Sequence, residues 1–121
     1  MIVIDTSVWA DHFRKPEEGL AEIGRSGKLR MHPFIVGEIA AGSLFQWDRT
    51  IAALRLIPVI EMIEEADFFV FMKDYQLMGS GLSYVDIHLL ASVRATKSAL
   101  LWTRDKKLAA KADELGCRFI P

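Results

Sequence analysis

The feature that most constrains the fold is a pair of short apolar runs near opposite ends of the chain, each followed closely by an aspartate. Ile2-Val3-Ile4 leads directly into Asp5, and Leu100-Leu101-Trp102 is followed by Thr103-Arg104-Asp105. The second run shows no alternation of polar and apolar residues, which is typical of a strand buried on both faces of a parallel sheet. Since parallel strands need crossover connections, we expect helices between them.

The rest of the sequence alternates helical patterns with further short apolar runs. We expect strands at residues 2–4, 29–31, 99–102 and 117–120. We expect helices over about residues 7–14, 16–24, 33–42, 47–56, 63–78, 83–96 and 105–115. Strands separated by helices favour right-handed crossovers and a parallel sheet covered on both faces. The order therefore predicts one domain, residues 1–121, with a three-layer α/β/α architecture.

Composition excludes several other classes of protein. Hydrophobic residues make up 51% of the chain and charged residues 26%, a balance that does not fit intrinsic disorder. Cys117 is the single cysteine, so no internal disulfide framework or Cys-based zinc site is expected. The densest apolar stretch, residues 68–72, is far shorter than the ~20 residues that span a bilayer. The N-terminus has no basic region of a signal peptide, and we expect a soluble cytoplasmic protein without membrane contact.

The charge is unevenly distributed, although the net charge is only −1. Residues 94–118 contain seven Lys or Arg against three Asp or Glu, while residues 61–74 contain five acids and one lysine. These runs are either solvated helix faces or, for the basic one, part of a local rim that binds phosphates. The candidate phosphate contacts are Arg14, Lys15, Arg104, Lys106 and Lys107.

Four acids are placed where a parallel sheet binds its ligands, beyond the carboxyl ends of the strands. Asp5 and Asp105 follow the first and third runs, Glu38 lies in the helix after the second, and Asp86 lies in the first turn of the helix that Ser83 begins. Each also has a purely structural explanation. Asp5 and Asp105 are N-cap candidates, Ser83-x-x-Asp86 matches a capping box, and Glu38 could be a solvated helix acid.

If the four acids converge, their charges require compensation. Two carboxylates ~4 Å apart repel by about 4 kcal/mol at an effective dielectric constant near 20. Either their pKa values rise or a cation binds. A ligand set made only of oxygens suits Mg²⁺ or Mn²⁺, and water bound to such an ion can attack a phosphodiester. Ser7 and Thr103 are small hydroxyl neighbours that could orient this water.

The same residues carry a resemblance to a known family. Ile2-Val3-Ile4-Asp5-Thr6-Ser7-Val8-Trp9 resembles the opening of PIN-domain ribonucleases of the VapC toxin type. Glu38 is similar to the second acid of that family. Leu82-Ser83-Tyr84-Val85-Asp86 resembles its third-acid helix, and Thr103-Arg104-Asp105 its Thr-x-Asp motif. The resemblance covers nearly the whole chain, and the ordered set of motifs is more specific than any one of them.

The resemblance implies a PIN fold and a metal-dependent endoribonuclease that cleaves single-stranded or loop RNA, such as tRNA or rRNA loops, to a 3′-hydroxyl and a 5′-phosphate. Asp5, Glu38, Asp86 and Asp105 correspond to the catalytic set that binds one or two Mg²⁺ or Mn²⁺ ions. The resemblance also implies a homodimer and neutralisation by a VapB-type antitoxin. Lys107 stands where some relatives have another acid, so a second ion is less securely implied.

Two other classes of protein and one non-catalytic function are alternatives to a PIN-type ribonuclease. A receiver domain needs an aspartate near the middle of the chain, and residues 50–60 contain none. A haloacid-dehalogenase-type phosphatase needs Asp-x-Asp, but Ser7 occupies the second position. A PIN-like module that binds protein or RNA without cleaving it stays open as the alternative.

Overall fold

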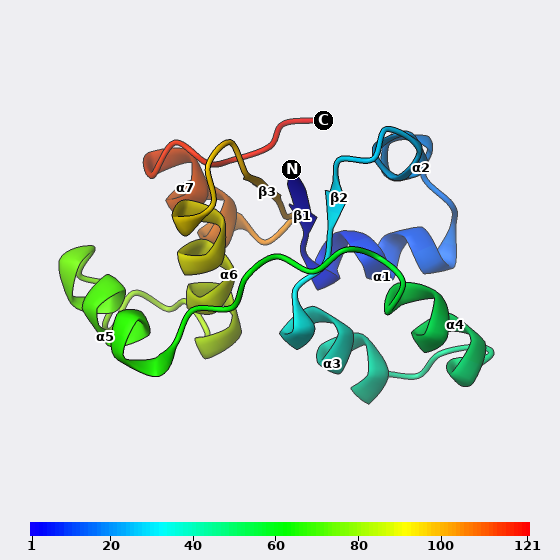
Figure 1. Ribbon diagram of the computed structural model, residues 1–121, viewed down its shortest axis with the longest axis horizontal. Coiled ribbons are helices and arrows are strands. Elements are labelled where there is room, and N and C mark those ends of the chain that lie inside the picture. Colours follow the sequence, from blue (N-terminus) through cyan, green and yellow to red (C-terminus); the bar gives the residue numbers. More distant parts are fainter.

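The computed structural model describes all of residues 1–121 and contains three strands and seven helices (Figure 1). The strands are β1 (Ile2–Ile4), β2 (Leu29–Arg30) and β3 (Leu100–Trp102). The helices are α1 (Thr6–Arg14), α2 (Glu18–Arg25), α3 (Pro33–Ala41), α4 (Trp47–Leu54), α5 (Glu65–Asp74), α6 (Tyr84–Ala95) and α7 (Lys106–Glu114). None of the helices combines the length and the apolar character needed to cross a bilayer.

The strands form a parallel sheet in the order β2-β1-β3, so that β1 is central. Ile2 lies opposite Leu29 on one side and Leu100 on the other. Figure 1 shows α5, α6 and α7 on one side of the strands and α1 to α4 on the other. The predicted α/β fold with a central parallel sheet between helices is confirmed.

Burial in the core explains why the sequences of the strands and of α6 show no clear alternation between an apolar and a polar face. Val3, Ile4 and Leu101 are fully buried in the sheet. Helix α6 packs against β3 on one side and α5 on the other, and all of residues 87–93 are buried. A helix covered on two sides has no wide solvent face, so its sequence is not clearly amphipathic.

Two predicted elements differ from the structure. The helix expected over residues 63–78 is shorter, because Gln76 adopts a left-handed backbone conformation with φ 53° and the chain turns there. Residues 117–120 do not form a strand. The Leu101 amide donates to the Cys117 carbonyl and the Leu101 carbonyl accepts from the Phe119 amide, which makes one isolated bridge. A similar bridge between Met31 and Val59 was not predicted.

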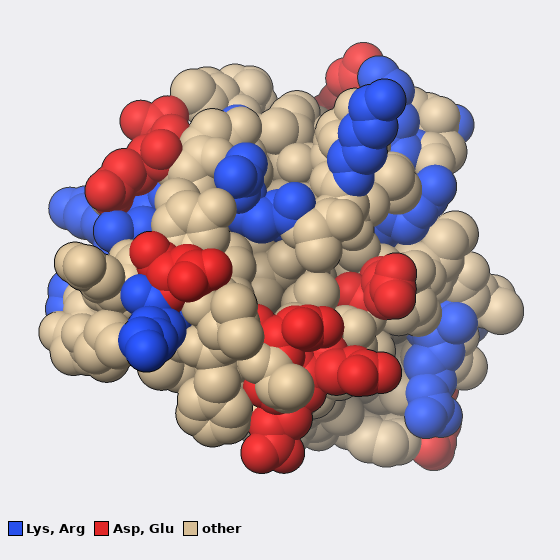
Figure 2. Space-filling view, turned by 60° about the vertical axis from the view of Figure 1, so that its left-hand side comes forward, with Lys and Arg blue, Asp and Glu red and all other residues tan.

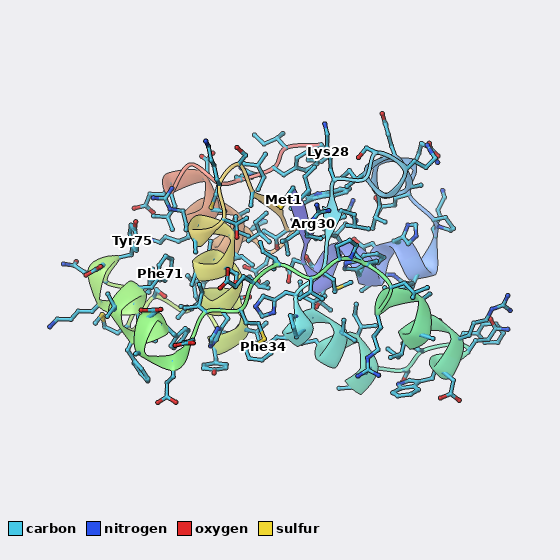
Figure 3. The ribbon with its side chains drawn as sticks, viewed as in Figure 1. Met1, Lys28, Arg30, Phe34, Phe71 and Tyr75 are labelled. Atoms are coloured by element: carbon cyan, nitrogen blue, oxygen red, sulfur yellow. The ribbon has the colours of Figure 1, made fainter.

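Two buried histidines join the start of α3 to α6. His32 is fully buried, and its Nδ1 accepts a hydrogen bond from the Phe34 amide at 3.0 Å. The His88 ring stacks on Phe68 with ring centroids 4.2 Å apart. The Phe34 ring lies edge-on to the His88 ring, with centroids 4.9 Å apart, between α3 and α6 (Figure 3). Nε2 of His32 and both ring nitrogens of His88 have no hydrogen-bond partner. Burial, helped by the neighbouring His88, lowers the pKa of His32 to about 4.

We predict that this histidine makes the protein less stable in mild acid. The folded pKa of His32 lies below its ordinary value of 6.5, so the unfolded chain binds the proton first as the pH falls. The free energy of unfolding should therefore decrease between these two pKa values, by about 3 kcal/mol from this residue. Urea unfolding at a series of pH values measures the decrease.

His32→Asn is the matched variant for that experiment. Asparagine keeps an acceptor for the Phe34 amide at the N-cap of α3 but does not titrate. Its stability should fall less steeply with acid than that of the wild type, because the His32 contribution is removed while those of the other titrating groups, His88 among them, remain. Identical slopes for the two proteins would show that His32 is not responsible.

Candidate active site

Asp5 lies between β1 and α1 and is nearly buried, with 7% of its surface exposed. Its Oδ2 accepts hydrogen bonds from Ser7 Oγ at 2.9 Å and from Thr103 Oγ1 at 2.7 Å. Although Asp5 occupies the N-cap position of α1, its side chain makes no capping hydrogen bond. The two hydroxyls thus fix the carboxylate, and the simple capping explanation for Asp5 is wrong.

Thr103 connects Asp5 to Asp105. Its hydroxyl donates to Asp5 and accepts a hydrogen bond from the Asp105 amide at 3.1 Å. Asp105 is the N-cap of α7, and its Oδ1 accepts from the Leu108 amide at 2.9 Å. The parallel pairing of β1 with β3 brings these residues together, because both strands end at the same edge of the sheet.

Asp86 reaches this edge from the first turn of α6. The predicted capping box is present: Ser83 Oγ accepts from the Asp86 amide at 3.1 Å, and Asp86 Oδ2 accepts from the Ser83 amide at 3.0 Å. Burial raises the pKa of Asp86, and the negative charges of Asp5 and Asp105 raise it further against the opposing hydrogen bonds from Ser83. The three aspartates are therefore close enough to act on each other electrostatically.

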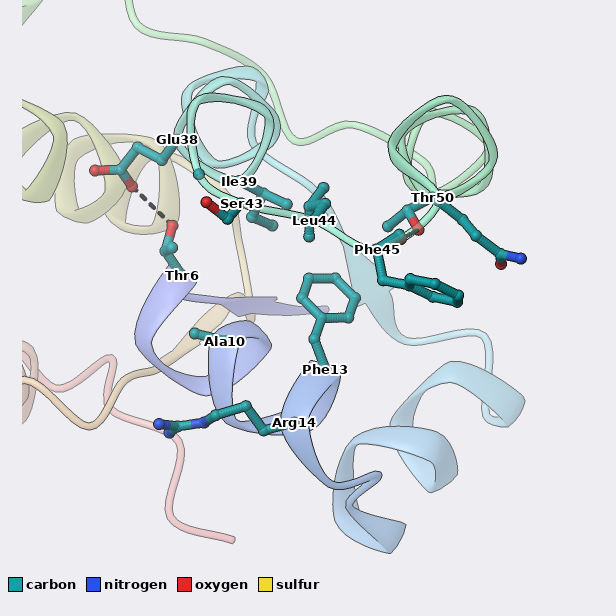
Figure 4. A pocket seen from close by; sticks show the side chains of 12 residues that line it. Thr6, Ala10, Phe13, Arg14, Glu38, Ile39, Ser43, Leu44, Phe45 and Thr50 are labelled. Atoms are coloured by element: carbon teal, nitrogen blue, oxygen red, sulfur yellow. Dashed lines mark hydrogen bonds between the residues drawn. The ribbon is translucent and has the colours of Figure 1, made fainter.

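Glu38 approaches from α3 on the other side of Asp5. Its Oε1 accepts a hydrogen bond from Thr6 Oγ1 at 2.7 Å, and Thr6 is the residue next to Asp5 (Figure 4). Sequence reasoning did not single out Thr6, because a threonine in the first turn of a helix has many ordinary roles. Glu38 also stands at one end of a groove of about 680 Å³, with Phe13 on one wall and Phe45 on the other.

The four carboxylates share one geometric property. In each, one oxygen is oriented by hydrogen bonds from the protein and no protein group donates to the other oxygen. Acidic side chains also gather near the middle of one face of the molecule, with Lys and Arg around them (Figure 2). However, no three His, Cys, Asp or Glu side chains stand close enough to hold a metal ion in these positions. The structure brings the acids into one region but spaces them more widely than a ligand set.

The five candidate phosphate contacts have different surroundings. Arg104 is bound to Asp11 and Glu17, and Arg14 also pairs with Asp11. Nζ of Lys107 lies against the turn before α6, where a Cβ on Gly81 would stand 2.8 Å from it. The other two cations, Lys15 and Lys106, are exposed and make no ion pair.

Comparison with known proteins agrees with this architecture. A family model of the PIN domain matches residues 2–114, and the chain belongs to the PIN-domain family. The crystal structure of PAE2754 from Pyrobaculum aerophilum has the same fold, with a TM-score of 0.61 and 18% identity over 97% of this chain and 96% of that chain.

A more specific likeness is found in sequence. The chain is 35% identical over 116 residues to "Ribonuclease VapC32" of Mycobacterium tuberculosis, in strains CDC 1551 / Oshkosh and ATCC 25618 / H37Rv. The match covers 96% of this chain and 94% of that protein. Within the PIN-domain family, the chain therefore belongs with the VapC proteins.

We predict that removing the Asp5 charge lowers the pKa of Asp86. Asp5→Asn keeps the size of the side chain but removes one of the two like charges that raise the Asp86 pKa. Titration of the Asp86 carboxyl carbon by NMR in metal-free protein measures the shift. Asp48→Asn, an exposed acid in the first turn of α4, is the control and should leave the titration unchanged. Equal Asp86 titrations in all three proteins would mean that the acids are not coupled.

Proposed function

We propose that this chain is a metal-dependent endoribonuclease of the VapC type, which hydrolyses phosphodiester bonds in single-stranded or loop RNA. The observation that carries the proposal is the placement of Asp5 and Asp105 at the ends of β1 and β3, joined through Thr103, with Asp86 near them on α6. The likeness to a protein named a ribonuclease supports the same reaction. Loops of tRNA or rRNA are candidate substrates of this reaction.

Asp5, Glu38, Asp86 and Asp105 would hold one or two Mg²⁺ or Mn²⁺ ions. The donors suit such ions, because all are carboxylate oxygens and each residue keeps one oxygen without a protein hydrogen bond. A cation bound among the acids would neutralise their mutual repulsion. When bound, the metal would activate water and stabilise charge on the phosphoryl oxygens.

The protein groups around the acids have separate tasks in this proposal. The hydroxyls of Ser7 and Thr103 both donate to Oδ2 of Asp5. These two hydrogen bonds fix the orientation of the carboxylate and leave Oδ1 for the metal. Binding of a cation would offset the negative charges of Asp5 and Asp105, which add to the effect of burial in raising the pKa of Asp86. Lys15, Lys106 and Lys107 would contact RNA phosphates around the site, which should make binding weaken as salt rises.

The alternative function is a PIN-like module that binds protein or RNA without cleaving it. One observation favours it: no three acidic or other ligand side chains are close enough to form a metal site in the present positions. Cleavage assays separate the two functions, because only the ribonuclease requires a divalent ion and all of its acids.

We predict that Asp5→Asn abolishes metal-dependent cleavage. RNA cleavage should occur with Mg²⁺ or Mn²⁺ and stop in a chelator. Asp5→Asn should lower the rate by about 100- to 1,000-fold, as for loss of one electrostatic group from an active site. Electrophoresis of end-labelled RNA measures the rate and the 5′-phosphate products.

Asp48→Asn is the control for this experiment, since it removes an exposed acid in the first turn of α4 that is not one of the four. It should cleave like the wild type. Equal cleavage by wild type and Asp5→Asn would identify a contaminating nuclease. Tight RNA binding without any cleavage by the wild type would favour the alternative function.

We also propose that the protein acts in the cytoplasm as a homodimer and is neutralised by a VapB-type antitoxin. Its VapC relatives support the antitoxin, which should co-purify with the chain and suppress cleavage. Exposed apolar side chains support a protein interface: Phe69 and Val70 on α5 are 57% and 56% exposed.

We predict that the wild type sediments as a dimer at high concentration. Burial of apolar surface contributes about 25 cal/mol per Å², so replacing both Phe69 and Val70 by Ser should shift the equilibrium to monomer. Leu56→Ser is the control, because Leu56 is 85% exposed but lies elsewhere, just after α4. Sedimentation equilibrium measures the mass. A monomeric wild type, or a dimer lost only in Leu56→Ser, would contradict the prediction.

A further inference from the structure

Arg104 stands in the middle of the segment that carries two site residues, between Thr103 and Asp105. Its guanidinium does not extend freely into solvent. Nη1 donates to Asp11 Oδ2 at 2.7 Å and to Glu17 Oε2 at 2.7 Å, and Nη2 donates to the other oxygen of Glu17. Its Cζ atom also lies 5.5 Å from the ring centroid of Trp102. Arginine forms this forked pair with a carboxylate, whereas lysine cannot.

The carboxylates that hold Arg104 come from two other segments. Asp11 belongs to α1, and Glu17 lies in the linker between α1 and α2. The Glu17 position is itself fixed, because its amide donates to His12 Nδ1 at 3.0 Å. The guanidinium therefore ties the β3–α7 loop to α1 and to the start of α2.

The backbone of Arg104 also connects the loop to the site through a hydrogen bond. Its amide donates to Ser7 Oγ at 3.0 Å, and Ser7 Oγ in turn donates to Asp5 Oδ2. A shift of the loop would move Ser7, Thr103 and Asp105 together, and with them the hydrogen bonds that orient Asp5. The side-chain clamp and the backbone bond thus act on the same set of groups.

The charges around Arg104 argue against an RNA contact. The Arg104 guanidinium is shared between two carboxylates, and Arg14 pairs with one of them, so the cluster of Arg14, Arg104, Asp11 and Glu17 has no net positive charge to offer a phosphate. The side chains of Arg104, Asp11 and Glu17 are about two-thirds buried. The hydrogen bond from Arg104 lowers the pKa of Glu17, which keeps that carboxylate charged.

We propose that Arg104 is a positioning residue, which clamps the Thr103–Asp105 loop against α1 through Glu17 and Asp11 and so sets the geometry of Asp5 and Asp105. This inference rests on the proposed ribonuclease function. It replaces the sequence-based prediction that Arg104 contacts phosphate. Glu17, which is an acid and repels RNA, becomes a residue required for turnover.

Arg104→Lys and Glu17→Gln test the clamp without large changes in size. Each should lower kcat by about 10- to 100-fold, the cost expected from misplaced catalytic groups, and leave KM unchanged. The double variant should be no slower than the slower single variant, since both changes remove one interaction. RNA binding, measured by anisotropy in the Asp5→Asn background, should not depend on Arg104→Lys.

Glu18→Gln is the matched control. It removes the same charge one residue further along, and Glu18 pairs only with Arg25 on its own helix. It should cleave RNA like the wild type. Hydrogen–deuterium exchange gives a second readout: the amides of Thr103 to Lys106 should exchange faster in Arg104→Lys and Glu17→Gln, and not in Glu18→Gln.

A phosphate contact would behave in the opposite way. Glu17→Gln would then free Arg104 and tighten RNA binding with kcat unchanged, and Arg104→Lys would change KM; either result overturns the inference. If the wild type cleaves no RNA, the proposed function fails, but the exchange measurement still decides the clamp. Unchanged exchange in both variants would overturn it independently of activity.

Discussion

The parallel pairing of β1 with β3 is the constraint on which the site depends. It places the carboxyl ends of the two strands side by side, so that Asp5 and Thr103 face each other across 98 residues of sequence. The Thr103 hydroxyl then makes a buried side-chain hydrogen bond between the two strand ends, and its oxygen also accepts a hydrogen bond from the Asp105 amide. A neutral hydroxyl can join two acids in this way, because it donates to one residue and accepts from the other.

Structural and chemical roles are combined in the same carboxylates. Asp86 and Asp105 both cap helices, as an ordinary reading of their positions predicts, but each cap uses a single oxygen. The cap fixes the rotamer and leaves the second oxygen available to a ligand. A capping role therefore does not argue against the proposed catalytic role, and for these two residues it supplies the orientation that this role needs.

The positively charged side chains near the site fall into two groups, those that form ion pairs and those that do not. Arg104 and Arg14 are engaged with Asp11, and Arg104 also with Glu17, whereas Lys15 and Lys106 make no ion pair. Cation count alone cannot make this distinction. The distinction depends on where two acids lie: Asp11 pairs with both arginines, and Glu17, in the turn between α1 and α2, pairs with Arg104.

Sequence by itself determined the strand and helix order, because apolar runs and Pro or Gly stops are local signals, and it determined which acids lie at strand ends and helix starts. It did not show that residues 57–60 and 117–120 add only single bridges, nor that the helix at residues 65–74 ends early at a left-handed turn. The partners of the site were likewise decided by tertiary structure alone: Thr6 with Glu38, and Arg104 with Glu17. Hydrogen bonds and charge coupling depend on distances between segments remote in sequence, and only the packed sheet and helices set those distances.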